Sequence, residues 1–307
     1  MSPIKVIHVV DRGASDAAHA QAAFLRDSLD PARFAASLVE TSSLRKLHRL
    51  FREQRPDVVH AHSLKSGVAA RAAAKSAGIK KFFYTPHAAG AAPRRSAAAR
   101  AFSRIMERAL ASRRPDVRDA YLGDFQEPLP HDDVLVAASG PMIHDLNTDA
   151  WVLLVQRLTD SRNGVRCAWI GGGPEEAKAR TNLANMNMLI KTAITGPVSA
   201  GEARQQLRGA DIYTRYSRVD AFSSDILDAM AAGLPVVASD LPAHRELVVP
   251  GTTGFLVSSE VELLERSQAL IDDADLRRRL GAAGRARVQR EFSRERLLTE
   301  LSRLYSA

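Results

Sequence analysis

Residues 216–257 contain the feature that most constrains how this chain can fold. The segment carries two acidic residues, Asp220 and Asp228, around a short loop rich in hydroxyl side chains. Asp228 lies among apolar residues with helical spacing, and Gly233 follows as a helix stop. Residues 235–239 are an apolar run that predicts a buried strand. A helix, a glycine stop and a buried strand in this order indicate a parallel α/β unit of the kind that binds nucleotides.

The same alternation of apolar runs and helical stretches extends over most of the chain. Strands are expected at residues 4–10, 34–40, 57–62, 81–85, 134–138, 165–170, 189–194, 211–213 and 235–239. Helices are expected at residues 17–29, 43–54, 67–77, 149–159, 200–209 and 292–305, with a short one around 226–230. Strands that alternate with helices of this length predict an α/β fold with parallel sheets.

The length of 307 residues is sufficient for two domains of ordinary size. Pro115, Pro128 and Pro130 lie where the strand–helix alternation restarts, with charged residues between them, which is typical of a linker. We expect an N-terminal domain at residues 1–125, a C-terminal domain at 126–290 and a final helix within 291–307.

The composition indicates which structural class the protein belongs to and which kinds of partner it can bind. Hydrophobic residues make up 45% and charged residues 25% of the chain, which is typical of a globular protein. The sequence contains no run of about 18 consecutive apolar residues, so no membrane-spanning helix is expected. The net charge of +8 suits nucleic acid, an anionic membrane face or phosphorylated substrates. Nucleic acid is not expected, because no zinc-finger spacing, RNP-type aromatic motif or Walker A loop is present.

The compartment expected from the sequence is the cytoplasm. The N-terminus begins with a strand pattern and has no long apolar segment typical of a secretory signal. The single cysteine, Cys167, cannot form an internal disulfide, and its apolar surroundings predict a buried structural thiol.

The run from Asp228 to Ser239 resembles the donor-binding segment of the retaining GT-B glycosyltransferases of family 4. The family pattern is Glu, seven residues, Glu, then Ala-Met-Ala-x-Gly-x-Pro-Val-Val-Ala-Ser. This chain continues after Asp228 as Ala-Met-Ala-Ala-Gly-Leu-Pro-Val-Val-Ala-Ser, but both acids are aspartate. The resemblance implies a GT-B fold: two Rossmann-like domains facing across a cleft, with a C-terminal helix that crosses back to the N-terminal domain.

The resemblance also implies an activity. A hexosyltransferase of this kind moves a sugar from a nucleotide-sugar donor to a hydroxyl acceptor and retains the anomeric configuration. The acceptor is expected to be a saccharide or a lipid-linked molecule in cell-surface polysaccharide or glycolipid synthesis. No cofactor and no metal are expected, because backbone amides and cations would stabilise the leaving diphosphate.

Peripheral contact with the inner face of a membrane is also expected. Residues 94–110 combine several arginines with apolar residues near helical spacing, and a basic amphipathic helix can lie on an anionic surface. A solvated helix that docks by its apolar side is the alternative interpretation.

Residues that match the family's motifs define the expected donor site. Asp220 and His87 are expected to be catalytic, and His87 ends a Thr-Pro-His motif at the end of a predicted strand. The expected donor-binding residues are Gly140, Gly171, Gly172, Gly173, Phe222, Ser223, Ser224 and Asp228, with Asp228 on the ribose. The glycine triplet resembles the family's Ile-Gly-x-Gly-Pro turn, and a plain strand-to-helix turn is the alternative. A dinucleotide motif is excluded because the last glycine of G-x-G-x-x-G would fall on Glu176.

The acceptor side is expected to include Gly13, His60 and His62. Gly13 follows the first predicted strand, where an ordinary turn is an equally good interpretation. His60 and His62 are two positions apart on a predicted strand, so their side chains share a face and are expected to line a cleft. A metal site is not expected, because neither a carboxylate nor a third histidine accompanies them.

Four charged donor contacts of the family are altered here. Pro141 stands where the family has arginine, Leu146 stands where it has lysine, and aspartate replaces both glutamates. The arginines considered as substitutes are Arg157, Arg215, Arg218 and Arg245, with Arg218 as first choice because it borders the Asp220 loop. The alternative function is therefore a catalytically weakened GT-B protein that serves as a partner or scaffold in polysaccharide assembly. A nucleotide-sugar epimerase fits the fold but not the motif.

Overall fold

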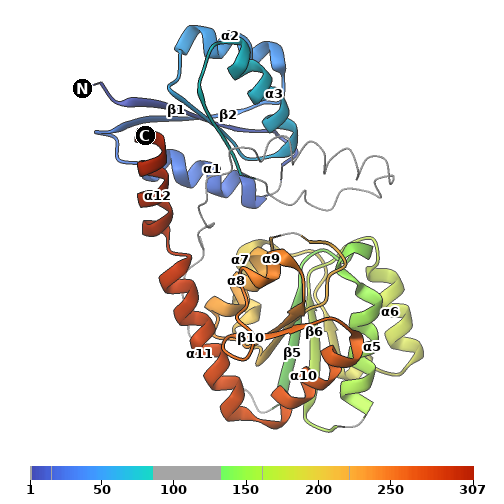
Figure 1. Cartoon of the computed structure of the whole chain (residues 1–307). Helices are drawn as coiled ribbons and strands as arrows, with labels where there is room; N and C mark the ends of the chain where they lie inside the picture. The colour runs from blue at the N-terminus through green and yellow to red at the C-terminus, as the bar shows by residue number, and fades with distance from the viewer. Residues whose placement is uncertain (1, 15, 86–132, 161, 221) are drawn as a thin grey trace. The chain divides into compact units, whose positions relative to one another are not determined.

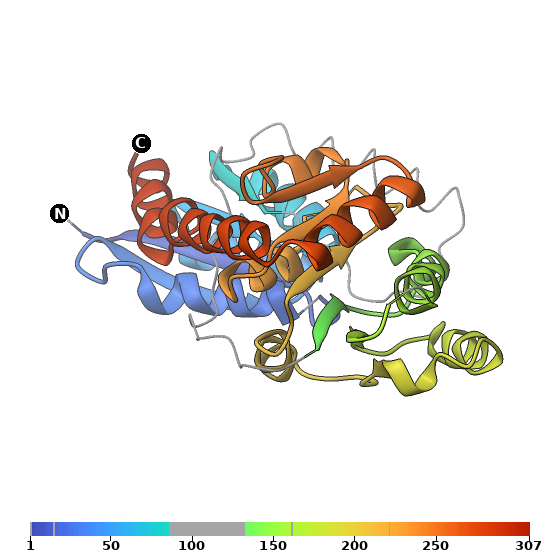
Figure 2. The same ribbon diagram turned by 90° about the horizontal axis from the view of Figure 1, so that it is seen from below.

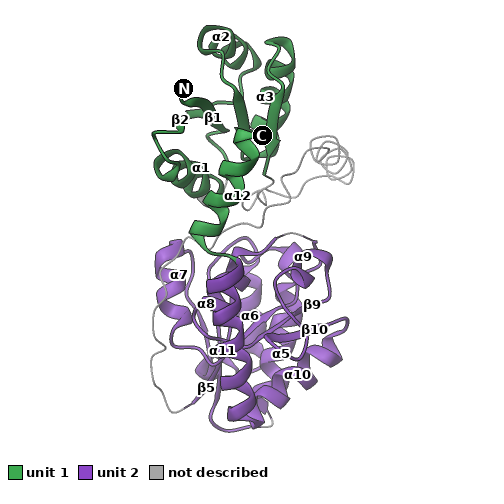
Figure 3. Cartoon of the chain, turned by 60° about the vertical axis from the view of Figure 1, so that its left-hand side comes forward, with its two compact units in different colours: residues 1–122, 292–307 green, residues 123–291 purple. Residues whose placement is uncertain are grey.

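The computed structural model describes residues 2–14, 16–85, 133–160, 162–220 and 222–307. The chain forms two compact units: unit 1 is Met1–Leu122 with Phe292–Ala307, and unit 2 is Gly123–Glu291 (Figure 3). Each unit contains its own parallel sheet, as the alternating pattern predicts. His87, the basic stretch at 94–110 and the proline-containing segment at 115–131 lie outside the described residues.

Unit 1 contains a four-stranded sheet with helices on both faces (Figure 1). Its strands are β1 (Ile4–Val10), β2 (Phe34–Glu40), β3 (Val58–Ala61) and β4 (Lys81–Tyr84), in the order β2-β1-β3-β4. Helices α2 (Leu44–Gln54) and α3 (Leu64–Ser76) pack on one face, and α1 (Asp16–Ser28) and α12 (Arg294–Ser306) pack on the other. Ile7 and Val9 point to the first face and Val6 points to the second, because side chains alternate along a strand.

The last helix of the chain belongs to unit 1. Leu297, Leu301 and Tyr305 are buried along one side of α12 at helical spacing. They pack with Val6 of β1 and Leu25 of α1 in one apolar cluster. Burial of this face therefore fixes α12 to the N-terminal sheet, although the intervening unit 2 separates the two in sequence.

Unit 2 contains a six-stranded sheet with helices around it (Figure 2). Its strands are β5 (Val134–Ser139), β6 (Val165–Ile170), β7 (Thr192–Ile194), β8 (Ile212–Arg215), β9 (Val236–Ser239) and β10 (Gly254–Val257). Its helices are α5 (Thr148–Asp160), α6 (Glu176–Asn185), α7 (Ala200–Leu207), α8 (Ser224–Ala231), α9 (Pro242–Arg245), α10 (Glu260–Asp272) and α11 (Ala274–Glu291). Among the described residues, none of the helices combines the length and the apolarity that a membrane crossing requires.

The strand order of unit 2, β10-β9-β8-β5-β6-β7, is that of a doubly wound sheet. From β5 the chain moves outward through β6 to β7, and then it returns to the other side of β5 and continues from β8 to β10. The direction reverses between β5 and β8, which pair in parallel through Val136 with Ile212 and Ala137 with Tyr213. In open α/β sheets this reversal leaves a crevice at the carboxyl ends of the two strands, where ligands bind.

The structure differs from the sequence-based expectations in a few elements. Leu189–Lys191 form a 3₁₀ turn rather than the start of a strand, so β7 is shorter than expected. Helix α3 begins at Leu64, earlier than expected, because the Ser63 side chain caps it by accepting a hydrogen bond from the Ser66 N–H. The elements α6, α9, β10, α10 and α11 were not predicted. Helix α11 contains Gly281, and close packing requires glycine at this position. A Cβ there would lie 1.9 Å from the Gly233 carbonyl oxygen.

Candidate functional site

The carboxyl ends of β5 and β8 bring together several residues that the sequence singled out. Gly140 follows β5, Gly171 follows β6, and Asp228 lies on α8, the helix after β8. Arg215 is the last residue of β8, and its Nη1 donates a hydrogen bond to the Ser139 carbonyl oxygen at 2.7 Å. These residues all belong to unit 2 and lie around the carboxyl ends of β5 and β8, where the strand order reverses and where open α/β sheets bind ligands.

Gly140 and Gly171 are required because their two turns pack backbone to backbone. Gly140 has a φ of +108° and Gly171 a φ of +138°, both in the region that favours glycine. A Cβ at Gly171 would lie 2.2 Å from the Gly140 carbonyl oxygen, which leaves no room for a side chain. The same oxygen accepts a hydrogen bond from Trp169 Nε1 at 2.8 Å. The alternative interpretation of tight strand-to-helix turns therefore has direct structural support, and the donor contacts of these glycines stay a prediction.

Gly172 and Gly173 are enclosed in the same way. A Cβ at Gly172 would lie 2.6 Å from Pro197 Cδ, and a Cβ at Gly173 would lie 2.8 Å from the Met142 carbonyl oxygen. The Met142 N–H donates a hydrogen bond to the Gly172 carbonyl oxygen at 3.0 Å. The turns after β5 and β6 are thus held against each other by close packing and by a backbone hydrogen bond.

Arg215 and Asp225 form an ion pair against the Gly140 turn. Arg215 Nη1 lies 3.0 Å from Asp225 Oδ2, and the side chains are 12% and 28% exposed, respectively. A Cβ at Gly140 would lie 3.0 Å from Arg215 Nη1 and 2.9 Å from Asp225 Oδ2. From the sequence, Arg215 was one of four arginines considered, whereas Asp225 was missed. The one available signal for Asp225 was its acidic side chain in the first turn of a helix.

A small cavity of about 10 Å³ lies beside Arg215. Arg215, Asn147 and Trp151 line it, and each has a buried polar atom without a hydrogen-bond partner among the described residues. These atoms are Arg215 Nε, Asn147 Oδ1 and Trp151 Nε1. Hydrogen bonds from Nη1 therefore orient the Arg215 side chain, while its Nε–H has no acceptor among the described residues.

Asp228 has a strongly perturbed carboxyl group. Its side chain is 13% exposed, and its Oδ1 lies 3.8 Å from Arg204 Nη1. Burial, reinforced by the nearby Asp225 carboxylate, raises the pKa of Asp228 to about 7 against the opposing effect of Arg204. A carboxyl group with such a pKa can both donate and accept hydrogen bonds near neutral pH, which marks it as a functional candidate.

The start of α8 presents hydroxyl groups and backbone donors. Ser223 precedes the helix and is 4% exposed, and its Oγ has no hydrogen-bond partner within the described ranges. Ser224 is exposed and Phe222 is half-buried. The first N–H groups of a helix lack partners within the helix, so this end attracts anions. Asp225, in the first turn, is the anion that the chain itself supplies.

Asp220 has a role in local structure. Its side chain is exposed, and Oδ1 accepts a hydrogen bond from the Ala243 N–H at 2.8 Å. Ala243 lies in the first turn of α9, whose N-cap residue, Leu241, provides no side-chain bond, so Asp220 caps this helix from outside. The catalytic role of Asp220 stays a prediction, as does that of His87.

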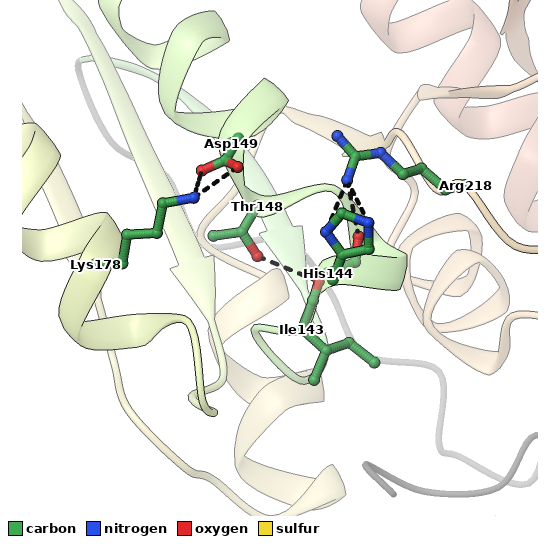
Figure 4. Close-up of polar contacts among 6 residues, drawn as sticks. All are labelled: Ile143, His144, Thr148, Asp149, Lys178 and Arg218. Carbon is green, nitrogen blue, oxygen red and sulfur yellow. Dashed lines mark hydrogen bonds and ion pairs between the residues drawn. The ribbon is translucent and has the colours of Figure 1, made fainter. Parts of the chain in front are cut away.

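The geometry favours Arg215 over Arg218 as the cation of the Gly140 turn. Arg218 lies over the 3₁₀ turn η2 (His144–Leu146), and its Nη1 is 3.0 Å from each ring nitrogen of His144 (Figure 4). Its backbone N–H donates to the Asp145 carbonyl oxygen at 2.9 Å. Arg218 therefore holds the loop before Asp220 to this turn, a role that its position in the sequence did not reveal.

Other cations near the crevice are bonded to carboxylates of the chain. Lys178 Nζ lies 2.7 and 2.8 Å from the two carboxylate oxygens of Asp149 (Figure 4). Arg245 donates two hydrogen bonds to Asp240, at 2.5 and 2.8 Å. Leu146, at the position where the family has lysine, packs against the apolar core of unit 2.

In unit 1, three histidines meet. His8 of β1 is paired with His60 of β3, and His62 follows the end of β3. All three are at most 1% exposed, and the rings of His60 and His62 are 4.3 Å apart. His60 and His62 do share a face, but they are buried rather than placed on an open cleft wall. The expectation that no third histidine accompanies them is wrong, because the parallel pairing of β1 with β3 brings His8 beside His60.

Several ring nitrogens of this cluster are hydrogen-bonded within the protein, whereas the buried His8 Nε2 has no hydrogen-bond partner among the described residues. His8 Nδ1 lies 3.0 Å from His62 Nε2, while His60 lies 2.5 Å from the Tyr305 hydroxyl and 2.8 Å from the Thr85 hydroxyl. One nitrogen from each histidine lies within 4.8 Å of the others, a spacing compatible with three ligands of one metal ion. Both nitrogens of His60 already have partners, so the observed bonds support a packing role that joins β1 and β3 to α12. Burial lowers the pKa of His8 to about 3.

A cavity of about 660 Å³ lies next to the turn that contains Gly13. Its lining consists of Arg12, Val39, Glu40, Thr41, Ser42, Ser43, Lys46, Arg49, Leu50 and Glu53. Gly13 itself is in a self-bonded turn, since its N–H donates to Asp11 Oδ1 at 3.0 Å. The volume falls in the range of small-molecule sites, about 300–1,000 Å³, so the structure offers a cavity on the side of unit 1 where an acceptor residue was expected.

Two family models match consecutive parts of the chain. The model of the glycosyl transferases group 1 matches residues 123–287, which include β5 to β10 and the crevice described above. The model of the glycosyl transferase 4-like domain matches residues 4–117. The first match alone covers more than half of the chain.

Curated relatives are similar over part of their length. The putative glycosyltransferase EpsD of Bacillus subtilis is 25% identical over 178 residues, which are 57% of this chain and 46% of the relative. A GDP-mannose-dependent monoacylated alpha-(1-6)-phosphatidylinositol monomannoside mannosyltransferase of Corynebacterium glutamicum is 26% identical over 169 residues, 52% of this chain and 44% of the relative. A phosphatidyl-myo-inositol mannosyltransferase of Mycobacterium tuberculosis is 30% identical over 180 residues, 55% of this chain and 42% of the relative. The chain therefore spans less than half the length of these curated relatives.

Solved structures share the fold over nearly the whole chain. Anabaena HepE in complex with UDP and glucose superposes with a TM-score of 0.75 at 14% identity, covering 99% of each chain. Sucrose-phosphate synthase of Thermosynechococcus elongatus superposes with a TM-score of 0.76 at 15% identity, covering 99% of this chain and 98% of the other. These similarities confirm the predicted GT-B fold. With the family model matched across the unit that carries the crevice, the chain belongs to the group 1 glycosyl transferases.

Proposed function

We propose that this chain transfers a hexosyl group from a nucleotide sugar to a hydroxyl acceptor, with retention of configuration, in polysaccharide or glycolipid synthesis. The observation that carries the proposal is the group 1 match over residues 123–287, since this part of the chain forms the switch-point crevice. Two relatives are, by name, mannosyltransferases that act on phosphatidylinositol compounds, which supports a hexosyl donor and a lipid-linked or saccharide acceptor.

The donor would bind at the carboxyl ends of β5 and β8. The backbone around Gly140, the start of α8 at Ser223 and the Arg215 guanidinium would face the diphosphate. Asp228 would bind the ribose hydroxyls, because its partly buried carboxyl group can form hydrogen bonds in addition to the 3.8 Å contact with Arg204. A structural relative, HepE, binds UDP, which supports a nucleoside diphosphate as ligand. Asp220 and His87 keep the catalytic roles that the family resemblance implies.

The transfer would proceed without a metal ion. In this proposal the charge that develops on the leaving diphosphate is stabilised by an arginine and by backbone N–H groups at a helix start. The expected result is that excess EDTA leaves the transfer rate unchanged, and a rate restored only by added Mg²⁺ or Mn²⁺ would reject this part of the proposal.

The acceptor would bind in unit 1. The cavity of about 660 Å³ near Gly13 has three cationic residues, Arg12, Lys46 and Arg49, against two acidic residues, Glu40 and Glu53, in its lining, and Arg49 lies 3.6 Å from Glu53. Such a lining suits an acceptor that carries phosphate, as a lipid-linked saccharide does. Peripheral contact with the inner face of a membrane would bring the enzyme to such an acceptor.

One observation favours the alternative function, a weakened GT-B protein that acts as a partner or scaffold in polysaccharide assembly. The cations expected after Gly140 are replaced by Pro141 and Leu146, and the arginine that the structure places there is already paired with Asp225. A site whose cation is neutralised by the chain itself binds a diphosphate less tightly than a site with a free cation.

Two measurements distinguish these functions. Calorimetric titration with UDP, GDP and ADP tests whether the crevice binds a nucleoside diphosphate. Release of the same diphosphate from nucleotide sugars, with and without a mixture of lipid-linked acceptors, tests for turnover. Binding with turnover supports the transferase, and binding without turnover from any donor supports the scaffold. If no nucleotide binds, the donor-site proposal is rejected.

A further inference from the structure

We propose that Arg215 is the residue that binds the donor diphosphate in this chain, and that Asp225 competes with the diphosphate for the same guanidinium group. The inference rests on the proposed function, because it concerns the phosphate groups of the donor. A nucleoside diphosphate would displace the Asp225 carboxylate from Arg215 and bind between the Gly140 turn and the start of α8.

The position of Arg215 agrees with this role. Arg215 ends β8 and Gly140 follows β5, so the two lie on the adjacent strands between which the sheet reverses direction. Arg215 Nη1 is 3.0 Å from the point where a Cβ of Gly140 would lie. The charge is therefore at the mouth of the crevice where α/β folds bind nucleotides.

The guanidinium group is also prepared for an anion. Its Nη1 donates to the Ser139 carbonyl oxygen at 2.7 Å, which orients the side chain without neutralising its charge. Its Nε is buried and has no partner in the described part of the chain. A planar guanidinium can bind phosphate oxygens through two parallel hydrogen bonds, and this geometry requires a side chain held in place from behind.

Asp225 is suited to compete because it occupies two anion-binding features at once. It lies in the first turn of α8, where a negative charge is stabilised by the helix dipole, and its Oδ2 lies 3.0 Å from Arg215 Nη1. Its side chain is 28% exposed, so it can turn toward solvent when a stronger anion arrives. The free energy needed to separate Asp225 from Arg215 would reduce the binding free energy of the diphosphate.

Ser223 provides an independent sign of a ligand at the start of α8. The residue is 4% exposed, and its Oγ has no hydrogen-bond partner among the residues described. A buried hydroxyl group without a partner is unfavourable. A phosphate oxygen bound at this helix end would supply the missing acceptor for the Ser223 hydroxyl.

The test compares variants of the full chain by calorimetry with UDP, GDP and ADP and with the matching nucleosides, which lack phosphate. Arg215→Gln is expected to weaken binding of the diphosphate about tenfold or more, and Asp225→Asn is expected to tighten it about tenfold, which corresponds to one charge-assisted contact. Nucleoside binding should change in neither variant. In the double variant, Asp225→Asn should bring no gain, since it acts through Arg215.

A matched ion pair provides the control. Arg166 on β6 lies 2.5 Å from Asp133, before the first residue of β5, at the amino end of the same sheet. Arg166→Gln should leave diphosphate binding unchanged. Circular dichroism checks that every variant is folded, and Arg215→Lys, which keeps the charge but not the planar group, should bind with intermediate affinity.

Two outcomes would overturn the inference in different ways. If the wild-type chain binds a diphosphate and Arg215→Gln, in a folded protein, binds it equally well, Arg215 is not the phosphate ligand, while the proposed donor site stands. If neither the wild-type chain nor Asp225→Asn binds any of the three diphosphates, the proposed function fails together with the inference.

Discussion

Each unit brings polar side chains together beside its parallel sheet, but the two clusters differ in burial and charge. In unit 1, His8 and His60 on β1 and β3 are buried, and Tyr305 of α12 is hydrogen-bonded to His60. In unit 2, Arg215 at the end of β8 and Asp225 on α8 are charged and keep part of their surface exposed. A helix of the same unit covers the first cluster, whereas the second is at the mouth of a crevice.

This difference shows what turns a buried polar cluster into a site. Both ring nitrogens of His60 have partners within unit 1, and burial lowers the pKa of His8, so this cluster stabilises the packing although His8 Nε2 lacks a partner among the described residues. In unit 2 the unused donors Arg215 Nε and Ser223 Oγ accompany the charged Arg215–Asp225 pair, so an anionic ligand that supplies the missing acceptor also interacts with the charge of Arg215.

Tyr305→Ala should remove the cover of the unit 1 cluster. Loss of a large buried side chain and of its bond to His60 is expected to lower the free energy of unfolding of unit 1 by about 3–5 kcal/mol. Hydrogen exchange of the β1 amides in urea measures this effect. Both tryptophans, Trp151 and Trp169, lie in unit 2, so tryptophan fluorescence follows the other unit separately.

The exposed Arg303 on the same helix offers a control for this variant. Arg303→Ala should change β1 exchange by less than about 0.5 kcal/mol. Equal protection of the β1 amides in Tyr305→Ala and in the wild-type chain would show that the histidine cluster does not depend on α12.

Asp228→Asn should change the pH dependence of unit 2. The folded-state pKa of Asp228, about 7, is above the ordinary aspartate value of 3.8, so the folded state holds a proton that the unfolded state has lost between these two values. Stability therefore falls as the pH rises from about 4 to 7. Asparagine removes this loss and should stabilise unit 2 at pH 8 by about 2–4 kcal/mol.

Tryptophan fluorescence in urea at several pH values measures the effect of Asp228→Asn. The wild-type chain and the variant should converge at about pH 3 and below, where the carboxyl group is mostly protonated in both states. Asp149→Asn, at an exposed carboxylate paired with Lys178, is the control and should keep the wild-type slope. A variant with the same slope as the wild-type chain would contradict the raised pKa.

His8→Gln should reveal the opposite sign in unit 1. Burial lowers the pKa of His8 from 6.5 to about 3, so between these values the unfolded state binds a proton that the folded state does not. Stability is then lost as the pH falls, by about 2 kcal/mol between pH 7 and pH 5. The variant should flatten this slope in β1 hydrogen exchange, whereas His48→Gln, on the half-exposed part of α2, should not.

Asp220→Ala should have the smallest effect on stability, a loss of about 1 kcal/mol, because it removes an external cap of α9. Asp220→Asn keeps an oxygen that can accept from the Ala243 N–H and should restore that stability. If diphosphate release from a nucleotide sugar is lost in Asp220→Asn as well, the negative charge itself is required. Full activity in both variants would leave Asp220 with its capping role alone.

Much of the fold was predictable because it depends on local patterns. Apolar runs bounded by turns located β1, β2 and β6 with the bounds observed, and the spacing of Leu297, Leu301 and Leu304 indicated the last helix. Helix α11 was missed because it is strongly polar and contains two glycines, which act against a helix in isolation. Gly281 is accounted for by close packing against Gly233, whereas a Cβ at Gly284 would make only ordinary contacts, at 3.6 Å or more, with Met230 of α8.

The candidate site was predictable in its motif and less so in its contacts. The glycines after β5 and β6 and the acid on α8 follow from a pattern that is contiguous in sequence. His8 was missed because its proximity to His60 depends on the parallel register of β1 and β3, which are separated by β2 and two helices in the chain. Asp225 was missed because only the pairing of β5 with β8 brings its partner, Arg215, to the Gly140 turn.

The sequence by itself determined the alternation of strands and helices, the family resemblance and the loss of the family's cations at Pro141 and Leu146. These properties depend on residues that are close in sequence, so residue type and spacing are sufficient to predict them. The tertiary structure decided which charges meet. It placed Arg215 rather than Arg218 at the Gly140 turn, paired it with Asp225, and enclosed the histidines beneath α12. The physical reason is that electrostatic and hydrogen-bond energies depend on distances of a few ångströms between side chains, which strand order and register set and sequence spacing does not.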